Sequence, residues 1–149
     1  EENSAGPTDE DLGQITEVIE SALDEAIYWR LVRRGLATGG YSQSYCWERD
    51  ASKPLRHARH YLKVTQLQIK FCPDIYTMDI EFICIPEGER RKGIGKRIFK
   101  SISWMVDKLG YKRIVLHSMK ASEPFWKAMG FIPVSPQNQN YPRRMYYEL

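Results

Sequence analysis

The feature that most constrains this sequence is a mostly apolar strand that runs into a basic, glycine-containing loop and then into a helix. Residues 75–85 (IYTMDIEFICI) give the clearest strand pattern in the chain, and residues 86–95 (PEGERRKGIG) form the loop. The helix extends to about Leu109, and residues 112–118 form the next strand. A strand, a helix and a second strand in this order predict a parallel strand pair.

The segments around this unit predict antiparallel strands. Residues 60–71 and 75–85, joined by the turn Cys72-Pro73-Asp74, indicate a hairpin, and a change of phase near Gln66 indicates a bulge. Other expected elements are strands at 41–47, 131–134 and 143–149, a loop at 48–57 and a helix at 122–129. A chain of 149 residues fits one domain. The predicted fold class is α/β, with a mixed, mostly antiparallel sheet (α+β), one parallel pair and flanking helices.

Charge is distributed unevenly between the N-terminal segment and the rest of the chain. Residues 1–25 contain nine Asp or Glu and no Lys or Arg, so the remaining residues carry +12 within a net charge of +3. Thr8 and Asp11 resemble a capping box, and apolar residues at helical spacing follow from Leu12 to Trp29. We therefore expect residues 1–7 to be disordered and residues 8–35 to form an acidic helix that ends at Gly35.

Composition and cysteine spacing exclude several classes of protein. No stretch approaches the roughly eighteen apolar residues of a membrane span, and no signal peptide is visible. Cys46, Cys72 and Cys84 are far apart and have no histidine at zinc-finger spacing. We therefore expect neither a disulfide scaffold nor a metal site, and a cytoplasmic protein without a membrane partner.

The loop before the helix has the composition of an anion site. Gly93 and Gly95 allow close backbone approach, and the free N–H groups at a helix start favour a negative charge. Residues 90–100 add six Lys or Arg. The spacing matches neither a Walker A loop nor a dinucleotide fingerprint. The segment therefore predicts a phosphate-bearing ligand, and the alternative is a solvated basic loop before an ordinary amphipathic helix.

Two motifs in the predicted order resemble a known superfamily. Arg90-x-x-Gly93-x-Gly95 after an apolar strand resembles motif A of the GNAT acyltransferases, and residues 125–131 (FWKAMGF) resemble motif B. The resemblance covers roughly residues 60–149. It implies a GNAT-like sheet whose parallel strands splay apart, and acetyl-coenzyme A as cosubstrate.

The resemblance also implies a set of coenzyme-binding residues. Backbone amides of the motif A loop would hold the pyrophosphate, and the pantetheine arm would pair with the preceding strand like an extra strand. An amine would then attack the thioester directly in a ternary complex, with no covalent intermediate on the protein. The implied coenzyme-binding residues are Ile83, Cys84, Ile85, Arg90, Arg91, Lys92, Gly93, Ile94, Gly95, Lys96, Ser122 and Trp126.

Three side chains are candidates for the base that deprotonates the amine. Strand alternation predicts that Asp79 and Glu81 share one face with Ile83 and Ile85. The alternative is that the two carboxylates sit at an exposed strand end and pair with Lys or Arg. His117 follows the next strand and would face the splayed gap, where an imidazole suits proton transfer. Its alternative is a packed or surface histidine.

The sequence departs from the family pattern at two places. Trp126 stands where the family commonly has the tyrosine that protonates the leaving thiolate, and indole is only a hydrogen-bond donor. Tyr141, Tyr146, Ser122 or water would have to substitute, or the thiolate leaves unaided. In addition, the acidic helix comes first, so the family's first strand is expected to be absent.

Three functions follow from these observations. The first is an N-acetyltransferase acting on an amine of a small molecule or a protein, as a monomer or homodimer. The second is a transferase of the same fold acting on nucleic acid, which is not favoured because the basic residues are expected to be spread over the surface. The third is a non-catalytic binding module. The nucleic-acid hypothesis would use Arg30, Arg33, Arg34, Arg49, Arg56, Arg59, Arg143 and Arg144, with Tyr41, Tyr45, Trp47 and Tyr61 for stacking.

Overall fold

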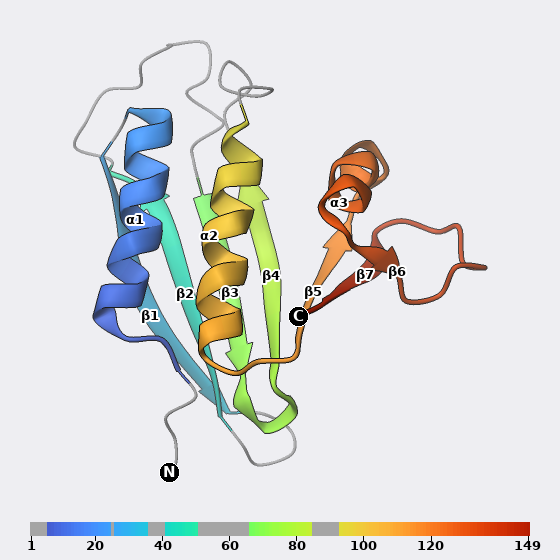
Figure 1. The fold of residues 1–149 in the computed structure, drawn as a ribbon, viewed down its shortest axis with the longest axis horizontal. Helices are drawn as coiled ribbons and strands as arrows, with labels where there is room; N and C mark the ends of the chain where they lie inside the picture. Colours follow the sequence, from blue (N-terminus) through green and yellow to red (C-terminus); the bar gives the residue numbers. More distant parts are fainter. Residues whose placement is uncertain (1–5, 25, 36–40, 51–65, 85–92) are drawn as a thin grey trace.

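A computed structural model describes residues 6–24, 26–35, 41–50, 66–84 and 93–149. Their strands form one seven-stranded sheet in the order β1-β2-β3-β4-β5-β7-β6, with helices packed against it (Figure 1). The strands are β1 (Ile27–Gly35), β2 (Tyr41–Arg49), β3 (Gln66–Cys72), β4 (Thr77–Cys84), β5 (Arg113–Ser118), β6 (Ile132–Pro133) and β7 (Arg143–Glu148). The helices are α1 (Asp9–Leu23), α2 (Ile94–Lys108) and α3 (Glu123–Met129).

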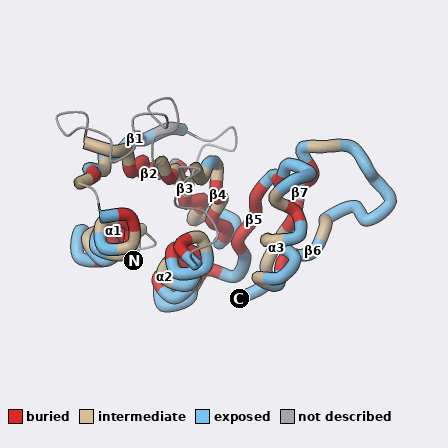
Figure 2. The backbone as a smooth tube through the Cα atoms, turned by 90° about the horizontal axis from the view of Figure 1, so that it is seen from above, coloured by how far each residue is buried: buried red, intermediate tan, exposed pale blue. Residues whose placement is uncertain are grey.

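Helices α1 and α2 lie side by side against one face of the sheet (Figures 1 and 2). They run antiparallel, because Lys108 at the end of α2 pairs with Asp11 at the start of α1. At the other end, Arg97 Nη2 donates to Ser21 Oγ at 3.4 Å. The apolar stripes of both helices pack on the sheet. The core includes Leu12, Ile15, Ile19, Trp47, Leu67, Ile69, Ile80, Ile98 and Ile102.

The acidic helix is shorter than the sequence predicts. Helix α1 ends at Leu23, and Asp24 adopts a left-handed conformation. Residues 27–35 form β1 instead, antiparallel to β2, and Gly35 ends this strand and not a helix. The error arises because Ala26 and Trp29 continue the helical spacing, whereas Ile27 and Trp29 alternate with the exposed Tyr28 and Arg30 as a strand does. The sheet edge that the sequence left without a strand is filled by β1, which follows α1 in the chain.

The other predicted elements are found close to their expected positions. The capping box at Thr8 and Asp11, the turn after Cys72 and helix α2 are confirmed. β2 runs two residues further than expected, so residues 48–49 belong to a strand and not to the predicted loop. Residues 60–65 and most of the loop at 48–57 lie outside the described residues.

The sheet is mixed, as the sequence predicts. β4 and β5 are parallel, and the other neighbouring strands are antiparallel. α3 packs on the same face as α2, because Phe99 of α2 contacts Trp126 of α3. All three cysteines are free. No helix in the described part of the chain is long and apolar enough to cross a membrane, and no metal-binding cluster occurs among the same residues.

Candidate functional site

The parallel strands β4 and β5 separate part-way along their length. They pair from Thr77 with Arg113 to Ile80 with Leu116, and no further pairing occurs among the residues that the structure describes. Both strands continue beyond this point, β4 to Cys84 and β5 to Ser118. The splayed pair predicted from the sequence is therefore present, and it opens toward the end of the sheet where α2 begins (Figure 1).

The N-terminus of α2 has no side-chain cap among the described residues. Its N-cap is Gly93, with φ 78°, and a Cβ built there would meet no described atom within 4 Å. Arg97 N donates to Gly93 O, so the N–H groups of the preceding helical residues have no acceptor within the helix. The first turn contains no acidic residue, and Lys96 and Arg97 are exposed. This helix end therefore favours an anion.

The predicted coenzyme residues divide into described and undescribed positions. Gly93, Gly95 and Lys96 lie at the N-terminus of α2, whereas the Ile94 side chain is buried and can offer only its backbone. Ile83 and Cys84 end β4. Ile85, Arg90, Arg91 and Lys92 lie outside the described residues. The binding role of all these residues remains a prediction.

A bulge at Glu81 changes which residues of β4 share a face. Ile69 pairs with Ile80, but Gln68 pairs with Phe82, so Glu81 is an extra residue on β4. The sequence predicts the bulge near Gln66 of β3. It lies instead on β4, at Glu81, opposite the step from Gln68 to Ile69. Residues beyond it change face, because strand side chains alternate.

The prediction that Ile83 shares a face with Asp79 is therefore wrong. Leu67 is buried among the core residues, and its partner Ile83 packs against the same core on the helix side. Asp79 and its partner Lys70 lie on the opposite side, which we call the far face. Ile85 lies outside the described residues, so its predicted face is not described.

Asp79 is a half-buried carboxylate on the far face. No hydrogen bond or ion pair to its side chain occurs in the described part of the chain. Burial raises the pKa of Asp79, as does the neighbouring Glu81, while the positive charges of Lys70, His117 and Arg144 act in the opposite direction. An unpartnered carboxylate with a raised pKa suits a general base.

Glu81 occupies a different environment from Asp79. Gln68 Nε2 donates to Glu81 Oε1 at 3.0 Å, and Lys70 Nζ lies 3.6 Å from Glu81 Oε2. The alternative for the two carboxylates is pairing with a nearby Lys or Arg. These contacts match that alternative for Glu81 but not for Asp79. The structure therefore separates two residues that the sequence left equivalent.

His117 lies on the far face of β5, exposed to solvent. Val115, two residues earlier, pairs with Asp79 across the parallel strands, and His117 itself pairs with Arg144 of β7. Residues two apart on a strand share a face. Asp79, His117 and Arg144 therefore lie on one face where β4 and β5 separate.

Trp126 belongs to an aromatic cluster in the core. Its side chain is 5% exposed, and its ring centroid lies 5.3 Å from that of Phe131 and 6.2 Å from that of Phe99. Ser122 is close by in sequence, and its hydroxyl contacts Met119 O and the hydroxyl of Ser118. Trp126 thus packs from α3 against α2. The coenzyme roles of Ser122 and Trp126 remain predictions.

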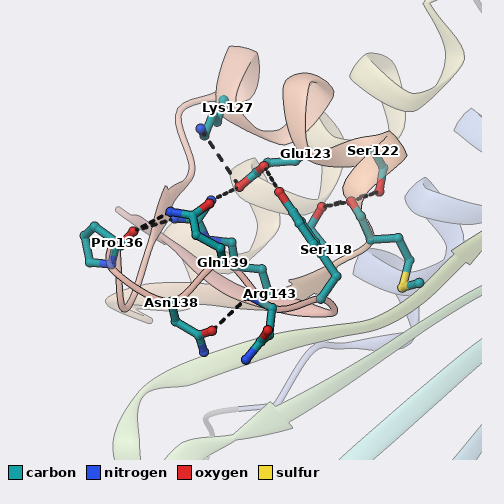
Figure 3. A network of polar contacts seen from close by, with 11 residues as sticks. Ser118, Ser122, Glu123, Lys127, Pro136, Asn138, Gln139 and Arg143 are labelled. Atoms are coloured by element: carbon teal, nitrogen blue, oxygen red, sulfur yellow. Dashed lines mark hydrogen bonds and ion pairs between the residues drawn. The ribbon is translucent and has the colours of Figure 1, made fainter.

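A polar network joins α3 to β7 (Figure 3). Arg143 Nη1 donates to Glu123 Oε2 at 2.7 Å and Nη2 donates to Pro136 O at 3.0 Å. Tyr141 also donates to Glu123, and this hydrogen bond together with Lys127 and Arg143 lowers the pKa of the carboxyl. Tyr141 is committed to that bond, which raises the pKa of its own hydroxyl. No local sequence pattern predicts the contacts of Glu123 with Tyr141 and Arg143, because these residues lie 18 and 20 positions from it.

Comparison with known proteins shows what this arrangement is similar to. The family model described as an acetyltransferase (GNAT) domain matches residues 75–141, which contain β4, α2, β5 and α3. Among solved structures, a putative N-acetyltransferase from Lactobacillus plantarum aligns with TM-score 0.52 and 13% identity over 98% of this chain and 94% of that one. The chain has the GNAT acetyltransferase fold.

Other GNAT structures align in the same way. An acetyltransferase from Bacillus cereus gives TM-score 0.51 and 15% identity, covering 100% of this chain and 96% of that one. The PaiA N-acetyltransferase from Thermoplasma acidophilum, in complex with coenzyme A, gives TM-score 0.50 and 13% identity. That match covers 70% of this chain and 60% of the Thermoplasma protein. No curated protein sequence matches this chain. The resemblance to GNAT acyltransferases predicted from the two motifs is confirmed.

Proposed function

We propose that this protein is an N-acetyltransferase that transfers an acetyl group from acetyl-coenzyme A to a primary amine. The observation that carries the proposal is the separation of β4 and β5 in front of the uncapped N-terminus of α2. The family match over residues 75–141 and the coenzyme A complex of the Thermoplasma relative support acetyl-coenzyme A as the cosubstrate.

The coenzyme fits the features of this helix end. Gly93 leaves room for a phosphate against the backbone, and the N–H groups of the first turn supply hydrogen-bond donors. Lys96 and Arg97 add positive charge. Backbone groups of β4 and β5 past Ile80 and Leu116 are not paired with each other and are available to the pantetheine amides.

The reaction proceeds by direct attack within a ternary complex. The Asp79 carboxylate takes a proton from the ammonium, and the amine nitrogen then attacks the thioester carbonyl carbon. The carbon–sulfur bond breaks, and the sulfur leaves with the electron pair. The nitrogen loses its remaining extra proton and the thiolate gains one through water, giving an N-acetyl amide and a free thiol. This route needs no tyrosine at the position of Trp126.

Asp79 is the preferred base for physical reasons. Glu81 is held by Gln68 and Lys70, so a proton on it would weaken those contacts. Asp79 has a raised pKa and lies on the face that also carries His117. His117, which is exposed on that face, would pass the proton from Asp79 to solvent.

The test is an acceptor screen with labelled acetyl-coenzyme A, repeated with substituted enzymes. We expect Asp79→Asn to lower kcat by roughly 100-fold or more, the usual contribution of a positioned base, without changing coenzyme affinity. In the unsubstituted protein, activity should fall as the pH drops through the raised pKa of Asp79, and this limb should be absent in Asp79→Asn.

Two matched variants sharpen the assignment. Glu81→Gln and His117→Ala should each slow turnover less than Asp79→Asn does. Folding is not at risk in Asp79→Asn, because a raised pKa means that the charged carboxylate costs stability at neutral pH. Equal turnover in all three variants would exclude the proposed base, and the absence of any acetylated product from a broad amine panel would exclude the activity.

A further inference from the structure

Arg144 is a cation on the far face that has no partner among the described residues. Neighbouring positive charges are engaged: Arg143 pairs with Glu123, Arg113 pairs with Glu148, and Lys70 lies beside Glu81. Arg144 is exposed, and its guanidinium makes no hydrogen bond or ion pair with the residues that the structure describes. A guanidinium left free beside a proposed active site is available for a substrate.

Strand register places Arg144 next to the proposed base. Arg144 pairs with His117 across β5 and β7, and Val115 pairs with Asp79 across β5 and β4. All of these side chains lie on the far face, because paired residues share a side of the sheet. The charge of Arg144 acts on Asp79 and partly offsets the rise in its pKa that burial causes. The two side chains nevertheless form no ion pair within the described residues.

Within the described part of the chain, the far face therefore presents two unpaired groups of opposite charge. A free carboxylate, Asp79, suits an ammonium group, and a free guanidinium, Arg144, suits a carboxylate or phosphate through its planar fork of donors. A ligand with only a cationic end would satisfy the first group and leave the second unused. A ligand that carries both charges would satisfy both.

We propose that the acceptor is an amine that also bears a carboxylate or phosphate group, and that Arg144 binds this anionic group while Asp79 receives the ammonium proton. The inference rests on the proposed acetyl transfer and narrows its acceptor class. Arg144 selects the acceptor and takes no part in bond making or breaking.

The experiment compares matched acceptors that differ only in the anionic group. One pair is L-phenylalanine and 2-phenylethylamine, chosen because Phe82 exposes an aromatic ring on the same face. The other pair is phosphoethanolamine and ethanolamine. KM and kcat are measured for each acceptor with the unsubstituted protein, Arg144→Gln and Arg144→Lys. Lys112→Gln, which removes an exposed charge just before β5, is the matched control.

We expect the anionic member of at least one pair to have the lower KM, and Arg144→Gln to raise that KM by about tenfold or more, the loss expected for a charged hydrogen bond. The member that lacks the anionic group should keep its KM and kcat. Arg144→Lys should recover part of the loss, and Lys112→Gln should change nothing. The pair that responds shows whether the group is a carboxylate or a phosphate.

The inference is overturned if both members of each pair are used equally well, or if Arg144→Gln affects both members alike. Binding of the same four compounds is also measured by calorimetry in the presence of coenzyme A, where no transfer occurs. If nothing is acetylated, the proposed activity fails. The binding preference and its dependence on Arg144 still decide the inference in that case.

Discussion

The two long helices of this protein begin in different ways. At the start of α1, Thr8 Oγ1 accepts from Asp11 N at 3.1 Å, and Asp11 Oδ2 accepts from Thr8 N at 3.0 Å. Lys108 pairs with the same carboxylate. At the start of α2, Gly93 offers no side chain and the first turn has no acid. The chain closes one helix end with its own groups and leaves the other for a ligand.

The difference teaches that two helices of equal length can use their N-termini for different purposes, one to stabilise the fold and the other to bind a ligand. Both helices have fifteen residues and both pack on the same sheet face. A self-capped end is already satisfied and repels further anions through its three acids. An uncapped end keeps its N–H groups and its partial positive charge for a phosphate. Substitutions that exchange these properties test the comparison.

The largest effect is expected when the end of α2 is given its own anion. Gly93→Asp places a carboxylate where the coenzyme phosphates are proposed to bind, and should weaken coenzyme A binding by about 100-fold or more. Gly93→Asn is the matched control, since it adds a similar side chain without charge and tolerates the left-handed conformation. Isothermal titration with coenzyme A measures both. Unchanged affinity in Gly93→Asp would place the coenzyme elsewhere.

A smaller effect is expected at the closed end, and on stability only. Although burial acts to raise it, hydrogen bonds from Lys108 and from Thr8 lower the pKa of Asp11 below its ordinary value. Asp11→Asn should therefore cost about 1–3 kcal/mol of unfolding free energy at neutral pH.

The pH dependence of Asp11→Asn supplies its own control. A lowered pKa gives stability that is present above the unfolded value and is lost as the pH falls through the folded value. The difference in unfolding free energy between the two proteins should therefore shrink below about pH 4. Thermal unfolding at several pH values measures it. Coenzyme affinity should not change, and a change there would contradict the separation of the two helix ends.

The smallest effect is expected from the cap hydroxyl of α1. Thr8→Ala removes one acceptor for Asp11 N and should cost about 1 kcal/mol, whereas Thr8→Ser should keep nearly all the stability. Urea unfolding of the three proteins measures this difference. If Thr8→Ala unfolds at the same urea concentration as the unsubstituted protein, the capping box does not contribute to stability.

Much of this arrangement could be predicted from the sequence, because its signals are local. The alternation from Thr77 to Cys84 and the helical spacing after Gly93 each identify one element without reference to the rest of the chain. The capping box at Thr8 and Asp11 is equally local. The motifs at residues 90–95 and 125–131, in that order, are enough to predict the GNAT-like fold.

The remaining features depend on partners that the sequence does not show. The boundary between α1 and β1 is set by pairing with β2, and this pairing begins at Ile27 although Ala26 and Trp29 continue the helical spacing. The position of the bulge depends on which residue of β3 faces Ile80. The contrast between Asp79 and Glu81, and the approach of Arg144 to His117, likewise come from register between strands.

The bulge at Glu81 also decides what kinds of side chain can stand next to each other on the far face. In a regular strand, consecutive residues point to opposite sides, so a carboxylate and an aromatic ring that are adjacent in sequence cannot share a surface. Glu81 bonds to Gln68, and Phe82 pairs with that same residue and is 47% exposed. One inserted residue therefore combines an acid and an exposed ring in a single contact surface, while Ile80 and Ile83 both remain in the core.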